Sequence, residues 1–246
     1  MKKQNILKNL VYSLLEKIIY PTGRNVNISG FSICLPFRYS RFFPKNYETD
    51  NMEFIRNNIS EGMTVIDIGA HIGLYTIAMG KIVKGSGKIY SFEPTPATFK
   101  VLQKNIHLNE MNNIVRPLNK AVSDTEGTTT FYINDTGVCN SNSLAYNNKK
   151  GIGINVALTS IDKLVETEKI SFIDIIKIDA EGAEYSVLKG SEKTLRKFRP
   201  KIILGLHPKS IENFGDSLIL IYDFISTLGY KITYENAKMN YEVYSN

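Results

Sequence analysis

The chain has 246 residues, 43% of them hydrophobic and 22% charged, the balance of a globular protein that can bury a core without disulfides or a structural metal. Its cysteines, Cys34 and Cys139, lie far apart with no CxxC or His/Cys cluster, so we expect free thiols in a reducing cytoplasm and exclude a structural zinc site. The net charge of +6 comes from dispersed lysines, and no RNA-binding or helix-turn-helix pattern stands out, so no nucleic-acid partner is expected.

An amphipathic helix is predicted near the start of the chain, over residues 2–19. Its apolar side chains form one stripe with lysines interspersed, and its apolar runs are too short and too charged to span a bilayer. The continuous apolar segment and small-residue cleavage site of a signal peptide are not found. We expect this helix to pack on the domain or on a second copy of the chain in a homodimer. The alternative is a peripheral contact with the inner face of an anionic membrane.

Residues 26–43 then predict short β segments, and residues 49–59 predict a helix. From Met63 onward strands alternate with helices, which are expected over residues 74–83, 97–108, 185–199 and 217–228, before a closing pair of strands. Near-continuous apolar strands between helices predict a mostly parallel α/β sheet, covered on both faces, with an antiparallel closing strand. We expect two parts: an N-terminal helix and β extension over residues 1–48, and one α/β domain over residues 49–246.

A polar stretch rich in Asn, Gly and Ser interrupts the alternation over residues 134–153. Its flanks, GTTTFYI and INVALTS, have strand character, which predicts a β excursion that carries a long loop. Loops of this length are usually functional or disordered. We expect a lid that faces the substrate, with Ser143 among the substrate-binding residues.

The motif VIDIGAHIG places Asp67 at the end of a strand, and Gly69 and Gly73 bracket the turn into the next helix. This spacing differs from the G-x-G-x-x-G of dinucleotide sites, where glycines let backbone amides approach a pyrophosphate. S-adenosylmethionine has no phosphate and needs an open turn over which its amino acid and ribose can lie. Gly69 permits that approach because no Cβ intrudes, and Asp67 is expected to engage the ligand's ammonium directly or through water.

Glu93, in YSFEP, ends the second strand 20 residues after Gly73. An acid at this place can accept hydrogen bonds from two ribose hydroxyls, and with the preceding motif it indicates a site for S-adenosylmethionine. The segment around Ala121, after the third strand, is expected to line the adenine edge. The full set of predicted cofactor-binding residues is Asp67, Gly69, Ala70, His71, Gly73, Tyr75, Thr76, Glu93, Pro94 and Ala121.

Several blocks in chain order resemble the FkbM family of S-adenosylmethionine-dependent methyltransferases, over residues 50–207: VIDIGAHIGLYT, FEPTPATFKVLQKNIHLN, LNKAVSD, LTSIDKL and IIKIDAEGAEYSVLKG. The first block is general to the class I methyltransferase fold, which is Rossmann-like, and the last is the most specific. The resemblance implies O-methylation of a hydroxyl on a sugar, glycan or natural product. N-methylation, a lipid-linked acceptor and a non-catalytic binding module are the alternatives. The family often has an acid before the histidine of the fifth strand, where this chain has Gly205.

The fourth strand delivers Asp179, with Glu181 and Glu184 following, to the edge where ligands bind in such sheets. Asp179 and His207, which ends the fifth strand, are the candidate general bases, and Glu181 is a candidate substrate-binding residue. Three neighbouring carboxylates could hold a divalent metal. Because Glu181 and Glu184 can instead stabilise the first turn of the next helix, a metal is not favoured.

Overall fold

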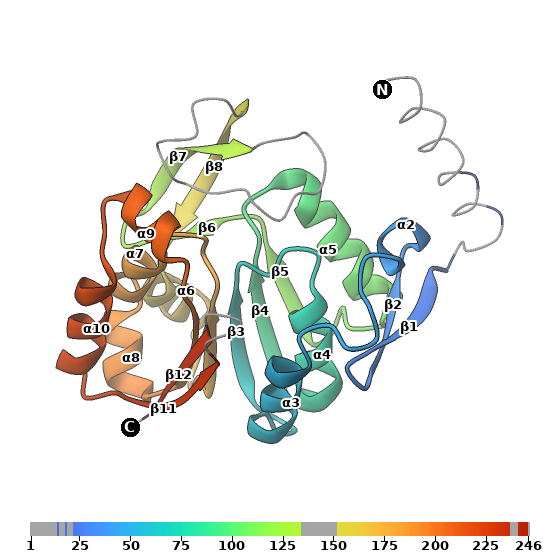
Figure 1. Ribbon diagram of the computed structural model, residues 1–246, viewed down its shortest axis with the longest axis horizontal. Helices are drawn as coiled ribbons and strands as arrows, with labels where there is room; N and C mark the ends of the chain where they lie inside the picture. Colours follow the sequence, from blue (N-terminus) through green and yellow to red (C-terminus); the bar gives the residue numbers. More distant parts are fainter. Residues whose placement is uncertain (1–13, 15–17, 19–21, 134–151, 237–240, 246) are drawn as a thin grey trace.

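The structure is a computed structural model that describes residues 14, 18, 22–133, 152–236 and 241–245. Its centre is a set of parallel strands: β3 (Thr64–Ile68), β4 (Lys88–Phe92), β5 (Val115–Leu118), β9 (Ile175–Ile178) and β10 (Lys201–Gly205). A closing pair, β11 (Lys231–Asn236) and β12 (Tyr241–Ser245), adds to this sheet with β12 antiparallel to both neighbours. The strand order β11-β12-β10-β9-β3-β4-β5 confirms the predicted mostly parallel sheet with an antiparallel closing strand (Figure 1).

Helices cover both faces of the sheet (Figure 1). One face carries α3 (Thr49–Asn58), α4 (Leu74–Val83) and α5 (Pro96–Leu108); the other carries α6 (Ile161–Glu168), α7 (Glu184–Lys189), α8 (Glu192–Phe198) and α10 (Leu218–Thr227). Alternate side chains of the central strands therefore enter two separate cores, as Val65 and Ile66 do on β3. This double burial explains why the strands are apolar on both sides in the sequence.

The N-terminal β segment is shorter than expected. It forms a hairpin of β1 (Arg24–Ile28) and β2 (Phe31–Leu35), and the short helix α2 (Phe37–Ser40) comes next. Pairing stops at Pro36, since proline has no N–H with which to continue the ladder. The predicted helix over residues 49–59 is confirmed as α3.

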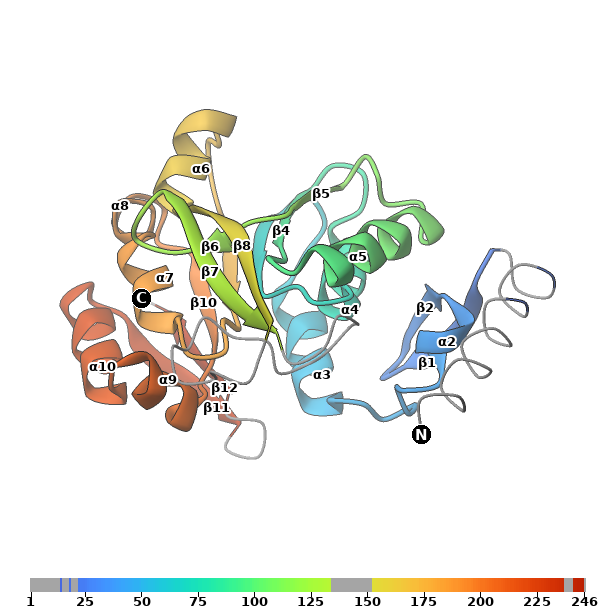
Figure 2. The same cartoon turned by 90° about the horizontal axis from the view of Figure 1, so that it is seen from above.

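Other elements differ from the expected alternation. The main sheet breaks off after β5, at Asn119, whose side chain donates hydrogen bonds to the carbonyls of Glu93 and Pro94. Beyond this break, β6 (Ala121–Val122) joins β7 (Gly127–Ile133) and β8 (Ile152–Thr159) in a separate small sheet, seen beside the main one in Figure 2. The helix expected over residues 185–199 is divided into α7 and α8 at Gly190, and α9 (Pro208–Phe214) was not anticipated.

Two predicted features lie largely outside the described residues: the helix over 2–19 and the loop over 134–153, of which Ile152 and Gly153 belong to β8. Ser143 and Cys139 lie outside the described residues. Leu14 and Ile18, which are described, are helical and have 60% and 70% of their surface exposed. Cys34 is a buried free thiol. A search of the described helices finds none with the length and apolar character needed to cross a membrane.

Candidate functional site

The carboxyl ends of β3, β4, β9 and β10 surround a cavity of about 320 Å³. This is where open α/β sheets bind ligands, because the connecting loops diverge beyond these strand ends. Most of the predicted cofactor-binding and catalytic residues line it: Gly69, Ala70, His71, Tyr75, Glu93, Pro94, Ala121, Asp179, Glu181 and His207. Asp67, Gly73 and Thr76 are not among the lining residues.

Glu93 lies directly after β4 and is buried with its carboxylate held by two backbone donors. The N–H groups of His71 and Thr95 lie 3.1 and 2.8 Å from its two oxygens. Burial nevertheless dominates, and raises the pKa of Glu93 to about 7. The carboxylate is thus oriented toward the β3–α4 turn, and it gains or loses its charge within the neutral pH range.

Gly69 brings two strand ends into direct contact. It has a φ of +76°, and a Cβ there would lie 1.9 Å from the carbonyl oxygen of Asp179. Only glycine fits this close approach and this left-handed backbone. Next in the turn, His71 has a φ of 51°, and burial lowers its pKa to about 4, so its ring is neutral at pH 7.

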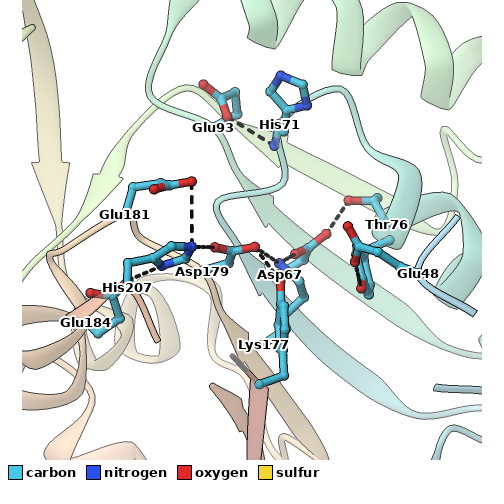
Figure 3. Close-up of polar contacts among 12 residues, drawn as sticks. Glu48, Asp67, His71, Thr76, Glu93, Lys177, Asp179, Glu181, Glu184 and His207 are labelled. Atoms are coloured by element: carbon cyan, nitrogen blue, oxygen red, sulfur yellow. Dashed lines mark hydrogen bonds and ion pairs between the residues drawn. The ribbon is translucent and has the colours of Figure 1, made fainter. Parts of the chain in front are cut away.

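Asp67 is fully buried beneath the cavity floor. It faces Lys177 across neighbouring strands β3 and β9, and the Lys177 Nζ lies 3.5 Å from the Asp67 Oδ1. The Thr76 hydroxyl donates to the other oxygen of Asp67 at 2.6 Å. Burial alone would lower the pKa of Lys177, but the charges of Asp179 and Asp67 raise it. The acid of the glycine motif is therefore engaged with protein partners (Figure 3).

Asp179 lies at the end of β9 and faces the cavity. Its Oδ2 is 3.5 Å from the Lys177 Nζ and accepts a hydrogen bond of 2.5 Å from the Tyr241 hydroxyl. Burial would raise the pKa of Asp179, but Lys177, Tyr241 and His207 together hold it below its usual value. Tyr241 occupies the space beside Gly205, where a Cβ would lie 3.3 Å from two of its ring atoms. Gly205, the departure from the family pattern, thus makes room for this tyrosine.

His207 lies among three carboxylates (Figure 3). Its Nδ1 is 3.2 Å from Glu184, and its Nε2 is 3.6 Å from Asp179 and 3.7 Å from Glu181. Burial would lower the pKa of His207, but the hydrogen bond to Glu184 and the carboxylate charges raise it to about 9. The ring is therefore protonated at pH 7. Donor atoms of Asp179, Glu181 and His207 lie within 4.8 Å of one another, close enough to hold a cation.

The lining residues that were not anticipated from the sequence include four residues with polar side chains and one aromatic residue: Tyr47, Glu48, Lys177, Tyr241 and Phe43. Lys177 had a usable signal, since it is a lone charge inside the apolar run IIKI. The other four come from segments far from the motif, before residue 49 or in the closing strand. No local pattern in these segments indicates that they return to the strand ends.

The cavity suits S-adenosylmethionine in its donor set. Glu93 can accept ribose hydroxyls near one end, and the carboxylates of Glu48, Asp179 and Glu181 provide negative charge for a cationic ligand. The N-terminus of α4, directly after the β3–α4 turn, favours an anionic group such as the methionine carboxylate. The chemistry of the lining thus matches each charged part of this cofactor.

The chain is similar to known methyltransferases. The methyltransferase FkbM domain matches residues 67–232. Methyltransferase sdnD of Sordaria araneosa is 28% identical over 182 residues, which cover 63% of this chain and 70% of that protein. Hexuronic acid methyltransferase AglP of Haloferax volcanii is 26% identical over 171 residues, covering 67% of this chain and 66% of that protein.

A solved structure shares the fold. The crystal structure of methyltransferase FkbM from Methylobacillus flagellatus superimposes with a TM-score of 0.54 at 15% identity, over 81% of this chain and 52% of that one. The chain therefore spans only about half of that larger protein. With its class I fold, its cavity and a domain match over most of its length, the chain belongs to the FkbM family of S-adenosylmethionine-dependent methyltransferases.

Proposed function

We propose that this methyltransferase acts on a hydroxyl group of a sugar, in a glycan or a small natural product. The observation that carries the proposal is the environment of Asp179, a carboxylate that faces the cavity and keeps its charge at neutral pH. Such a group can accept the proton of a hydroxyl as the oxygen is methylated. His207 is already protonated at pH 7, so we assign the base to Asp179 and a positioning role to His207.

The cofactor, when bound, supplies a methyl group on a sulfonium with a good leaving group. We assign the ribose to Glu93 and the adenine edge to the segment at Pro94 and Ala121, which line one part of the cavity. Asp179 and Glu181 line another part, where they can hold the acceptor oxygen in line with the methyl group. Positioning of this kind supplies much of the rate enhancement of a transfer reaction.

A sugar acceptor is favoured by the polar rim and by one relative. Glu181 is partly exposed at the cavity, so its carboxylate can accept hydrogen bonds from neighbouring sugar hydroxyls. The AglP relative is by its name a hexuronic acid methyltransferase. These two observations support a sugar acceptor. A place in polysaccharide biosynthesis is part of the proposal.

The surroundings of the enzyme are proposed on the sequence alone. We propose a cytoplasmic protein, with the segment over 2–19 in contact either with a second copy of the chain or with the inner membrane surface. The division into an N-terminal extension over 1–48 and a methyltransferase domain over 49–246 is likewise a proposal. Phe43, Tyr47 and Glu48 line the cavity, so the extension contributes to the site.

The test is methyl transfer from radiolabelled S-adenosylmethionine to a panel of sugar nucleotides, glycans and amines, with Asp179→Asn compared with Glu212→Gln. Glu212 is exposed on α9 and serves as a matched charge-neutralising control. We expect turnover at saturating cofactor to fall about 100-fold or more in Asp179→Asn and to be unchanged in the control. Labelling of amines but not sugars, or full turnover in Asp179→Asn, would contradict the proposal.

A further inference from the structure

The glycine motif leads one to expect that Asp67 binds the ammonium of the cofactor's amino acid, but its partners occupy it. Asp67 has no exposed surface, contacts Lys177 on one oxygen and accepts the Thr76 hydroxyl on the other. Asp67 is also absent from the residues that line the cavity, so a ligand bound in the cavity does not reach its carboxylate. The ammonium therefore needs another carboxylate.

Glu48 lines the same cavity and lies next to the first turn of α4, where its carboxylate accepts a hydrogen bond from the Tyr75 hydroxyl. Tyr75 is the second residue of α4, which follows the Gly69–Gly73 turn over which the amino acid of the cofactor is expected to lie. The hydroxyl is an uncharged donor. Lys177, whose charge also interacts with that of Glu48, is already in contact with Asp67 and Asp179. The negative charge of Glu48 is thus available to a ligand.

The backbone at Glu48 directs its side chain away from its own helix. Glu48 is the residue before α3, with φ and ψ of 45°, and its carboxylate does not cap the helix. A left-handed conformation is unfavourable for a residue with a side chain. Helix capping by the side chain is also forgone, although an acid there would stabilise the helix N-terminus. The carboxylate is instead aimed toward Tyr75 and the cavity.

The β1–β2 turn holds the segment before Glu48 in place. The Ser29 hydroxyl donates to the carbonyl of Tyr47 at 2.7 Å, and the Ser29 N–H donates to the carbonyl of Lys45. The Arg56 guanidinium on α3 donates to the carbonyl of Ser29 at 2.7 Å. The N-terminal hairpin therefore fixes Glu48 at the cavity wall.

We propose that Glu48 binds the α-ammonium of the cofactor's methionine part, the role that the motif would otherwise give to Asp67. The inference rests on the proposed placement of the ribose at Glu93, with the amino acid extending over the β3–α4 turn. It makes the N-terminal extension part of the cofactor site. The Asp67–Lys177 pair then supports the cavity floor without contacting the ligand.

The experiment compares two ligands that differ in the amino acid, whose ammonium Glu48 would bind. S-adenosylhomocysteine carries the amino acid, whereas 5′-methylthioadenosine keeps the adenosine and sulfur and lacks it. Calorimetric titration of the full chain is performed with wild type, Glu48→Gln, Glu93→Gln and the control Glu53→Gln. Glu53 is exposed on α3, the helix that begins directly after Glu48. Thermal unfolding of each variant checks that it is folded.

We expect Glu48→Gln to weaken S-adenosylhomocysteine about tenfold or more, the usual effect of losing a charged hydrogen-bond partner, and to leave 5′-methylthioadenosine unchanged. Glu93→Gln should weaken both ligands, and Glu53→Gln neither. Equal weakening of both ligands by Glu48→Gln would show a structural role for Glu48, and no weakening would also overturn the inference. Unchanged binding of both ligands in Glu93→Gln would instead overturn the proposed ribose placement.

Discussion

The Nδ1 of His207 lies 3.2 Å from a carboxylate oxygen of Glu184, a residue with no exposed surface. Glu184 is held in turn by the N–H of Gly182, which lies 3.1 and 2.9 Å from its two oxygens. The contact between His207 and Glu184 fixes the plane of the imidazole and directs its Nε2 toward Asp179 and Glu181. His207 therefore acts as a fixed positive charge beside the proposed base.

Replacing His207 by Gln should lower turnover and remove a pH-dependent part of the stability. The folded pKa of about 9 exceeds the ordinary value of 6.5, so the stabilisation is fully present below pH 6.5 and is lost as pH rises through 9. Thermal unfolding from pH 6 to 10 should show wild type above His207→Gln at the acidic end, with the two converging above pH 9. Parallel curves across this range would contradict a protonated His207.

Replacing Lys177 by Met should destabilise the fold more than replacing its partner. Lys177→Met leaves the buried Asp67 without its cation, and removing one member of a buried pair costs about 3 to 5 kcal/mol. Asp67→Asn leaves Lys177 in contact with Asp179, so its cost should be smaller. Urea unfolding of both variants and of the double variant measures this. The double variant should be more stable than Lys177→Met alone; an additive loss would refute the coupling.

Cofactor binding should depend on pH through Glu93. Its pKa is about 7, and protonation removes acceptor capacity for the ribose hydroxyls, so S-adenosylmethionine should bind up to about tenfold more weakly at pH 6 than at pH 8. The contribution of Glu93 to the stability of the fold changes with pH in the opposite direction. A raised carboxyl pKa stabilises below the unfolded value and this contribution is lost as pH rises through 7. Because the cofactor binds more tightly at pH 8, the increase in Tm on adding it should be larger at pH 8 than at pH 6.

The Glu93→Gln variant provides the control for that titration, since its side chain carries no ionisable proton. Its affinity should be lower than that of wild type at pH 8 and should show a smaller change between pH 6 and pH 8. A slope equal to that of wild type would assign the pH dependence to another group, such as the ligand's own amine, whose ordinary pKa lies near 8.

Most of the sheet could be predicted from the sequence because its strands and turns are encoded by local patterns. The runs at β3, β4, β9 and β10 are apolar between helices, and the Gly69 turn has a steric requirement that only glycine meets. The charge partners of the site residues could not be predicted from such local patterns. The contact between Lys177 and Asp67 depends on the register between two strands that lie more than 100 residues apart in the chain. Glu48 and Tyr241 reach the site through long-range packing.

Removing divalent metal should leave turnover unchanged in wild type, because the carboxylates around His207 already have a positive charge among them. The imidazolium lies 3.6 and 3.7 Å from oxygens of Asp179 and Glu181, so it already balances the charge of the two carboxylates that could otherwise bind a cation. The measurement is turnover after dialysis against EDTA, with and without added Mg²⁺. Loss of activity with EDTA and recovery with Mg²⁺ would show a metal-dependent enzyme. In His207→Gln the three carboxylates keep their charge and lose the imidazolium, so added Mg²⁺ should partly restore turnover in that variant alone.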